Sequence, residues 1–223
     1  TLNRIAPLVV NGRHIKSINQ YYNKEVAILK SELAQNSNNQ QQTSFKIKRF
    51  TQKRNNKILT ELHKVSKFIV DWLLENQIAC LVIGKNDNWK QEVDIGKRNN
   101  QNFVYIPHAK LIDQLRYKCK RVGILLLTTE ESYTSKCSFV DYEPLCSQKN
   151  VFPDNFGNQV EVISYKGKRV KRGLFRTQQH LLVNSDINGA GNQIRKVAGD
   201  EVYKNSNSVV DVAVHPVRVV LRA

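Results

Sequence analysis

The sequence lacks methionine altogether, and its first residue is Thr1. Because a translated chain begins with methionine, we expect these 223 residues to be a piece of a longer reading frame. No apolar run reaches the roughly 18 residues that a membrane span needs, and no signal peptide is recognisable. The four cysteines form no CxxC pair. They are typical of reduced cytosolic thiols, and not of a disulfide framework or a metal cluster.

Acidic residues are scarce relative to basic ones. Asp and Glu number 19 against 35 Lys and Arg, which leaves a net charge of +16. Such an excess favours a polyanionic partner, and nucleic acid more than a membrane surface. The basic residues gather at the start of a predicted helix and in the segment "YKGKRVKRGLFR" (165–176). We predict that they contact phosphates, although a solvated basic hairpin at 165–176 stays open as the alternative; the residues concerned are Arg49, Lys53, Arg54, Lys168, Arg169, Lys171 and Arg172.

The hydrophobic pattern predicts alternating strands and helices. Apolar stripes predict helices over about 17–34 and 53–76, and Pro107 opens a third. Continuous apolar runs at 78–84 and 122–131 predict strands that are buried on both faces. Their strand–helix–strand order predicts a parallel pair. Sites in α/β sheets form beyond the C-terminal ends of such strands, where Glu130 and Glu131 lie.

A lone carboxylate opens the stretch "NSDINGAGNQIRK" (184–196). Asp186 is either a plain helix cap or a ligand for a cation, and the residues alone leave both open. Behind it, an apolar stripe predicts the buried side of the helix, formed by Ile187, Ala190, Ile194 and Val197. Gly189 and Gly191 weaken a helix by roughly 1 kcal/mol each. They therefore indicate a close approach of the backbone to something else.

Two carboxylates on separate elements suit phosphodiester hydrolysis by two metal ions. That chemistry gathers carboxylates around Mg²⁺ ions about 4 Å apart, and Mg²⁺ prefers oxygen ligands. Glu131, at the end of a strand, and Asp186, at the start of a helix, are the candidate catalytic and metal-binding residues. A third carboxylate is expected to complete the set.

Four blocks of the sequence resemble, in order, the C-terminal half of the TnpB (OrfB) proteins of bacterial insertion sequences. They are "HKVSKFIVDWLLENQIACLVIGKN", "FVYIPHAKLIDQLRYKCKRVGI", "TTEESYTSKCSF" and "NSDINGAGNQIRKV". The resemblance implies an RNA-guided DNA endonuclease with a RuvC-like domain of the RNase H fold, incomplete here at its N-terminus. It also implies Mg²⁺ as cofactor, DNA and a guide RNA as partners, no membrane, and a nucleoid-associated place in the bacterial cytoplasm.

The resemblance assigns the family's three catalytic acids as follows. The last acid matches Asp186, with Asn188 and Asn192 as companions expected to contact nucleic acid. The middle acid usually stands near Gly84, where this chain has none. Some relatives instead place a glutamate just before "YTS", which matches Glu131, and we favour this rearranged site over a simple loss. The first acid is expected upstream of the chain, on the missing N-terminal portion.

The zinc ribbon of the family is degenerate in this chain. Cys137 matches its first ligand, but Val140 stands at the partner position and His180 is alone. Four soft ligands cannot be assembled, so we predict no structural zinc. The chain is accordingly divided into a truncated RuvC-like domain (1–131), a basic insert in place of the ribbon (132–184), and the last RuvC-like helix with a C-terminal tail (185–223).

Two classes of function remain open. The chain is either the C-terminal part of an RNA-guided endonuclease, inactive as this fragment, or a nuclease-dead remnant or regulator that binds nucleic acid. A basic ribosome-binding or RNA-binding protein would fit the charge but not the ordered blocks.

Overall fold

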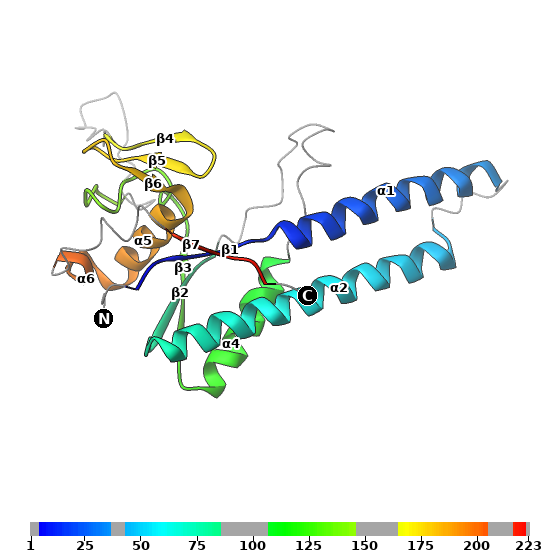
Figure 1. Ribbon diagram of the computed structural model, residues 1–223, viewed down its shortest axis with the longest axis horizontal. Helices are drawn as coiled ribbons and strands as arrows, with labels where there is room; N and C mark the ends of the chain where they lie inside the picture. The colour runs from blue at the N-terminus through cyan, green and yellow to red at the C-terminus, as the bar shows by residue number, and fades with distance from the viewer. Residues whose placement is uncertain (1–4, 37–42, 86–106, 146–164, 205–215, 222–223) are drawn as a thin grey trace, which may run out of the picture. The chain divides into compact units, whose positions relative to one another are not determined.

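The computed structural model describes residues 5–36, 43–85, 107–145, 165–204 and 216–221 (Figure 1). Helices and strands are mixed along the chain, which confirms the predicted α/β class. The chain divides into two compact units. One comprises Val10–Leu74, Lys90–Val122 and Val220–Ala223, and the other comprises Thr1–Val9, Glu75–Trp89 and Gly123–Val219. The functional boundaries predicted at 131 and 184 stay a prediction.

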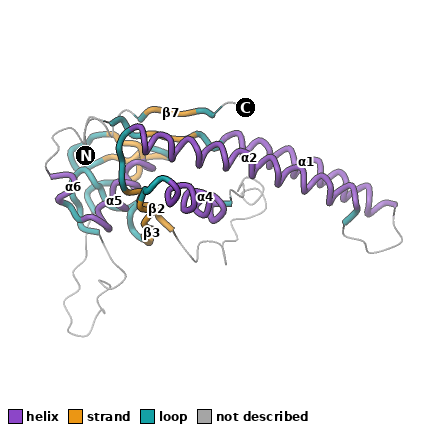
Figure 2. The backbone as a smooth tube through the Cα atoms, turned by 90° about the horizontal axis from the view of Figure 1, so that it is seen from below, coloured by secondary structure: helices purple, strands orange, loops and turns teal. Residues whose placement is uncertain are grey.

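The first unit is helical. Figures 1 and 2 both show α1 (Arg13–Asn36) and α2 (Phe45–Glu75) side by side. Both helices begin earlier than their apolar stripes predict, because polar residues cap them. Asn11 Oδ1 accepts a hydrogen bond from Arg13 N (3.0 Å), and Ser44 Oγ accepts one from Ile47 N (3.3 Å). The core between the helices consists of Ile15, Ile58 and Leu62, with Ile18 and Leu111 packed against it.

Polar contacts attach α4 (His108–Arg121) to α2. Ser66 is fully buried, and its hydroxyl lies 3.0 Å from Gln114 Oε1. Lys118 Nζ donates to Ser66 Oγ (2.6 Å) and to the carbonyl of His63 (2.9 Å). Burial lowers the pKa of Lys118. None of the helices that the structure describes is long and apolar enough to cross a bilayer.

The second unit contains the predicted parallel pair. β2 (Cys80–Lys85) pairs in parallel with β3 (Leu125–Glu130), in a register that runs from Cys80 opposite Leu125 to Lys85 opposite Glu130. The pairing is confirmed, but the prediction that both faces are buried is wrong, because every residue of the two strands is at least partly exposed. Their described sheet has only two strands. The helix α5 (Ser185–Ala198) packs against both.

A small antiparallel sheet completes this unit. β4 (Lys168–Lys171), β5 (Leu174–Arg176) and β6 (Leu182–Asn184) follow one another in order. The segment 165–176 therefore does form a hairpin, which turns at Gly173 with φ +77°. The sheet and α6 (Glu201–Lys204) enclose a core of Phe139, Val140, Phe175, Val183 and Tyr203. A third sheet pairs β1 (Leu8–Val10) with β7 (Val217–Val219).

Candidate functional site

Glu131 follows β3, and the backbone around it is held in place from two sides. Its carbonyl accepts hydrogen bonds from Thr134 N (3.2 Å) and Thr134 Oγ1 (2.8 Å). Lys196 of α5 donates to the carbonyls on either side, those of Glu130 (3.1 Å) and Ser132 (2.7 Å). The Glu130 carboxylate accepts a hydrogen bond from Ser132 Oγ, two residues along the chain (2.5 Å). The Glu131 side chain is exposed, and its carboxylate stays available for a ligand.

Gly84, where the resemblance expects the middle acid, is enclosed by two other side chains. Gly84 N donates to Gln193 Oε1 of α5 (3.1 Å). A Cβ added at Gly84 would lie 2.2 Å from Gln193 Nε2 and 2.6 Å from Glu131 Cγ. The space beside the strand end that a residue at 84 would need is therefore occupied by Glu131 and Gln193.

Asp186 lies in the first turn of α5 but does not cap it. Asn184 is the cap, because its Oδ1 accepts from the backbone N–H of Asp186 (2.8 Å) and of Ile187 (3.3 Å). The interpretation of Asp186 as a plain cap is thereby excluded, and its side chain is exposed. Asp186 precedes Gln193 by two turns on the same face of the helix, about 10 Å along the axis at ~1.5 Å per residue.

The side of α5 that is most buried is polar, which corrects the predicted apolar stripe. The buried members of α5 are Asn188, Gly191, Asn192 and Arg195. Of the predicted stripe, Ile187 and Ile194 are only partly buried against the core, while Ala190 and Val197 are exposed. The close approach that the glycines indicated holds for Gly191, where an added Cβ would meet Phe139 at 2.5 Å. It is wrong for Gly189, where an added Cβ would meet nothing within 4 Å.

Asn188 and Asn192 bind the turn that follows Glu131. Asn188 Oδ1 accepts from Phe139 N (3.1 Å), and its Nδ2 donates to the Cys137 carbonyl (2.8 Å). Asn192 Nδ2 donates to the carbonyls of Thr134 (2.9 Å) and Cys137 (2.8 Å). Both side chains are 0% exposed. The prediction that they contact nucleic acid is therefore wrong, because no part of them reaches the surface.

Arg195 extends this buried network, and the sequence reasoning missed it. Its Nη1 donates to Asn192 Oδ1 (2.9 Å), and its Nε pairs with Asp200 Oδ1 (2.7 Å). Burial raises the pKa of the neighbouring Tyr203 to about 12, against the opposing effect of the Arg195 charge. The spacing of Asn188, Asn192 and Arg195 at intervals of four and three, one helical face, was the available signal.

A carboxylate joins two segments of the basic insert that replaces the family's zinc ribbon. Glu143 is 7% exposed and accepts three backbone N–H bonds, from Ser138 (2.6 Å), Lys166 (2.6 Å) and Gly167 (2.9 Å). Cys137 is buried, with its thiol near the Tyr133 carbonyl (3.6 Å), and Val140 lies in the core. In the described part of the chain, no three His, Cys, Asp or Glu residues group as a metal site. The absence of zinc stays a prediction.

The basic residues predicted to contact phosphates lie in two groups, one in each unit. Every residue of β4 is exposed, as is Arg172 in the turn that follows it. Arg49 and Lys53 are exposed on α2, whereas Arg54 is half-buried. Their binding to nucleic acid stays a prediction, as does the metal site shared by Glu131 and Asp186.

Comparisons with known proteins give two family matches. A family model described as a probable transposase (OrfB_IS605) matches residues 3–90, and one described as "Cas12f1-like, TNB domain" matches residues 108–193. No curated protein matches the chain. Among solved structures, a chain from the cryo-EM structure of the Cas12f1–sgRNA–target DNA complex is similar, with 18% identity and a TM-score of 0.47. The match covers 77% of this chain but only 40% of that one.

Proposed function

Because the chain is a TnpB-like protein, we propose that it forms the C-terminal part of an RNA-guided DNA endonuclease. Its second unit would contribute to a RuvC-like nuclease domain of the RNase H fold. The observation that carries the proposal is the environment of Gly84. The Glu131 side chain fills the space beside this glycine, next to Gln193. Gln193 belongs to α5, the helix that carries Asp186 in its first turn.

Glu131 and Asp186 are the residues that would hold Mg²⁺. Both carboxylates are exposed, and oxygen ligands suit this ion. They fit the site only in part, since the described residues group no third ligand with them. The resemblance implies that the first of the family's three catalytic acids lies on a strand upstream of this chain. The bound metal would stabilise the charge on the attacking and leaving oxygens of the phosphodiester.

The chain's own residues would orient these two ligands. Thr134 and Lys196 fix the peptide on both sides of Glu131. Asn184 satisfies the helix N-terminus, and this leaves the Asp186 carboxylate available for a ligand.

DNA and a guide RNA are the proposed partners, and the excess of basic residues supports a polyanion. The exposed strand β4 places Lys168, Arg169 and Lys171 on one hairpin, followed by Arg172. In the insert, we propose that the Glu143 carboxylate takes over the structural role of zinc, since it joins the turn at Ser138 to the start of the hairpin.

A nuclease-dead protein that binds nucleic acid is the second candidate. The absence of an acid at Gly84 favours it. It predicts the same binding to nucleic acid but no cleavage under any condition.

The deciding experiment joins the chain to the upstream portion of a close relative and supplies guide RNA and Mg²⁺. Cleavage of a matched DNA target is expected, while the chain alone should not cut. Glu131→Gln and Asp186→Asn should each abolish cleavage and leave binding nearly unchanged, because both variants keep the shape of the side chain and remove its charge. Glu130→Gln is the matched control and should still cut. Cleavage that survives Glu131→Gln but not Glu130→Gln would move the role to Glu130, and no cleavage at all would favour the second candidate.

A further inference from the structure

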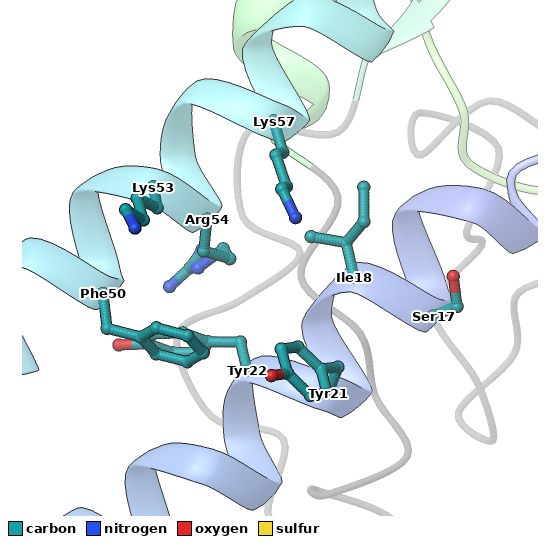
Figure 3. Close-up of a pocket in the computed structure, with 8 residues that line it drawn as sticks. All are labelled: Ser17, Ile18, Tyr21, Tyr22, Phe50, Lys53, Arg54 and Lys57. Carbon is teal, nitrogen blue, oxygen red and sulfur yellow. The ribbon is translucent and has the colours of Figure 1, made fainter. Parts of the chain in front are cut away.

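A groove of about 330 Å³ lies between α1 and α2, within the helical unit (Figure 3). From α1 it is lined by Ser17, Ile18, Tyr21 and Tyr22, and from α2 by Phe50, Lys53, Arg54 and Lys57. Its volume is at the lower end of the roughly 300–1,000 Å³ of small-ligand clefts. The groove therefore has room for one planar group with its substituents, and not for a duplex.

The charged residues of the groove all have the same sign. Lys53, Arg54 and Lys57 line it, and among the residues that the structure describes no acidic one does. Figure 3 shows Arg54 and Lys57 extending from α2 toward the α1 side. The Nε atom of Arg54 is buried and lacks a hydrogen-bond partner among the described residues. Leaving a buried N–H donor without an acceptor costs free energy. The three neighbouring positive charges also repel one another, and a bound anion would offset this repulsion. The groove thus suits a negatively charged ligand.

Three aromatic rings line another part of the groove, and one of them, Tyr21, is open to solvent. Tyr22 stacks on Phe50, with ring centres 5.8 Å apart and planes at 13°, and the Arg54 guanidinium lies 4.3 Å from the Tyr22 ring centre. The Tyr22 hydroxyl donates to Thr51 Oγ1 (2.8 Å), because the Thr51 hydroxyl itself donates to the Ile47 carbonyl. Tyr21 is 58% exposed and meets Phe50 edge-on at 5.9 Å. Its ring is available for stacking against a flat group.

We propose that this groove binds a single unpaired nucleotide of RNA or DNA, with its base against Tyr21 and its phosphate near Lys53, Arg54 and Lys57. A base supplies a flat π-face and a phosphate supplies the anion, and no other part of a nucleic acid combines the two. An acidic peptide would use the cations but leave Tyr21 unused. The site rests on the proposed function, because a protein that works with a guide RNA and an opened DNA target meets unpaired nucleotides. It adds Tyr21 and Phe50 to the basic residues that the sequence predicts to contact nucleic acid.

Binding of labelled single strands to the whole chain, followed by fluorescence anisotropy, tests the site. The probes are a short oligouridine, a short oligothymidine, the same strands with abasic residues, and a duplex of equal length. Tyr21→Leu should weaken binding of the strands with bases by roughly 5- to 150-fold, the range expected when the stacking of one base is removed. It should leave the abasic strands and the duplex unchanged. Lys57→Gln should reduce the salt slope of single-strand binding by about 0.7.

Tyr117→Leu is the control, because Tyr117 is a comparably exposed tyrosine (44%) on α4 and outside the groove. Tighter binding of oligouridine would assign the nucleotide to RNA, and tighter binding of oligothymidine to DNA; both support the site. Equal binding by Tyr21→Leu and the parent chain would overturn it, as would an equal weakening on abasic strands or competition by an acidic peptide.

The proposed function can fail separately. If Tyr21→Leu has no effect but alanines in the β4 hairpin remove binding, the groove is wrong and the proposed function stands. If the parent chain binds none of the probes, both are wrong.

Discussion

Gly84→Ala tests the close packing between the strand end, Glu131 and Gln193. The added Cβ would lie 2.2 Å from Gln193 Nε2 and 2.6 Å from both Gln193 Cδ and Glu131 Cγ. The Gln193 amide is the end of a flexible side chain and can move away, but the hydrogen bond from Gly84 N is then broken, which costs about 0.5–1.5 kcal/mol. Glu131 Cγ is in the middle of its side chain, so the carboxylate must shift with it. Overpacking of this kind costs roughly 1–3 kcal/mol.

We therefore expect Gly84→Ala to lower the free energy of unfolding by about 2–4 kcal/mol. Urea unfolding of the chain, followed by circular dichroism, measures this decrease. In the completed nuclease, the same variant should also cut more slowly, because the proposed metal ligand is displaced.

Two further variants show where the destabilisation arises. Gln193→Ala removes the nearest clash, so the double variant should be destabilised clearly less than the sum of the two single variants. Gly189→Ala is the matched control, since its Cβ would meet nothing within 4 Å, and helix propensity should make it more stable by up to about 1 kcal/mol. A destabilisation below about 0.5 kcal/mol for Gly84→Ala would refute the packing argument, as would strict additivity with Gln193→Ala.

Three more predictions concern other parts of the chain. Glu143→Gln should destabilise it by about 2–4 kcal/mol in urea unfolding, because the charge is lost and one of the two acceptor oxygens becomes an NH2 group that faces a backbone N–H. An effect no larger than that of Glu32→Gln, at an exposed site, would contradict this. Burial would raise the pKa of Glu61, but the hydrogen bonds from His14 and Lys64 outweigh it and lower the pKa below its ordinary value of 4.5. The stability that Glu61 contributes is therefore present above about pH 4.5 and disappears as the pH falls through the lowered pKa; Glu61→Gln should flatten this acid limb in pH-dependent unfolding. Alanines at all four basic residues of the hairpin 168–172 should weaken binding to any DNA or RNA sequence and reduce the salt slope by roughly 0.7–0.9 for each phosphate that is no longer neutralised, and an unchanged slope would mean that the hairpin is only solvated.

The periodic parts of the fold could be predicted from the sequence. Apolar stripes and runs indicate the helices, the parallel strands and their order, because burial of one face imposes a period on the residues that fill it. Helix starts were missed where a cap lies outside the stripe, as at Ser44, well before the predicted start at about residue 53. The burial of β2 and β3 was overestimated, since residue type reports what a strand could bury and not which neighbours cover it.

The site was harder to predict, because its chemistry is carried by residue types that are usually exposed. The resemblance led us to expect that Asn188 and Asn192 contact nucleic acid, yet both are buried and form hydrogen bonds to a turn some fifty positions earlier in the chain. Gly84 suggested only a missing acid. That its space is filled by Glu131 depends on how β2, β3 and α5 pack, which no local pattern contains.

The turn after Glu131 and the helix after Asp186 depend on one another for their polar contacts. The carbonyls of Thr134 and Cys137 and the N–H of Phe139 are bonded by Asn188 and Asn192. Burying such groups without partners would cost roughly 1–3 kcal/mol each, so each segment stabilises the other in this form. The same turn fixes the Glu131 carbonyl through Thr134. The two carboxylates proposed to bind metal therefore belong to segments that share one buried hydrogen-bond network.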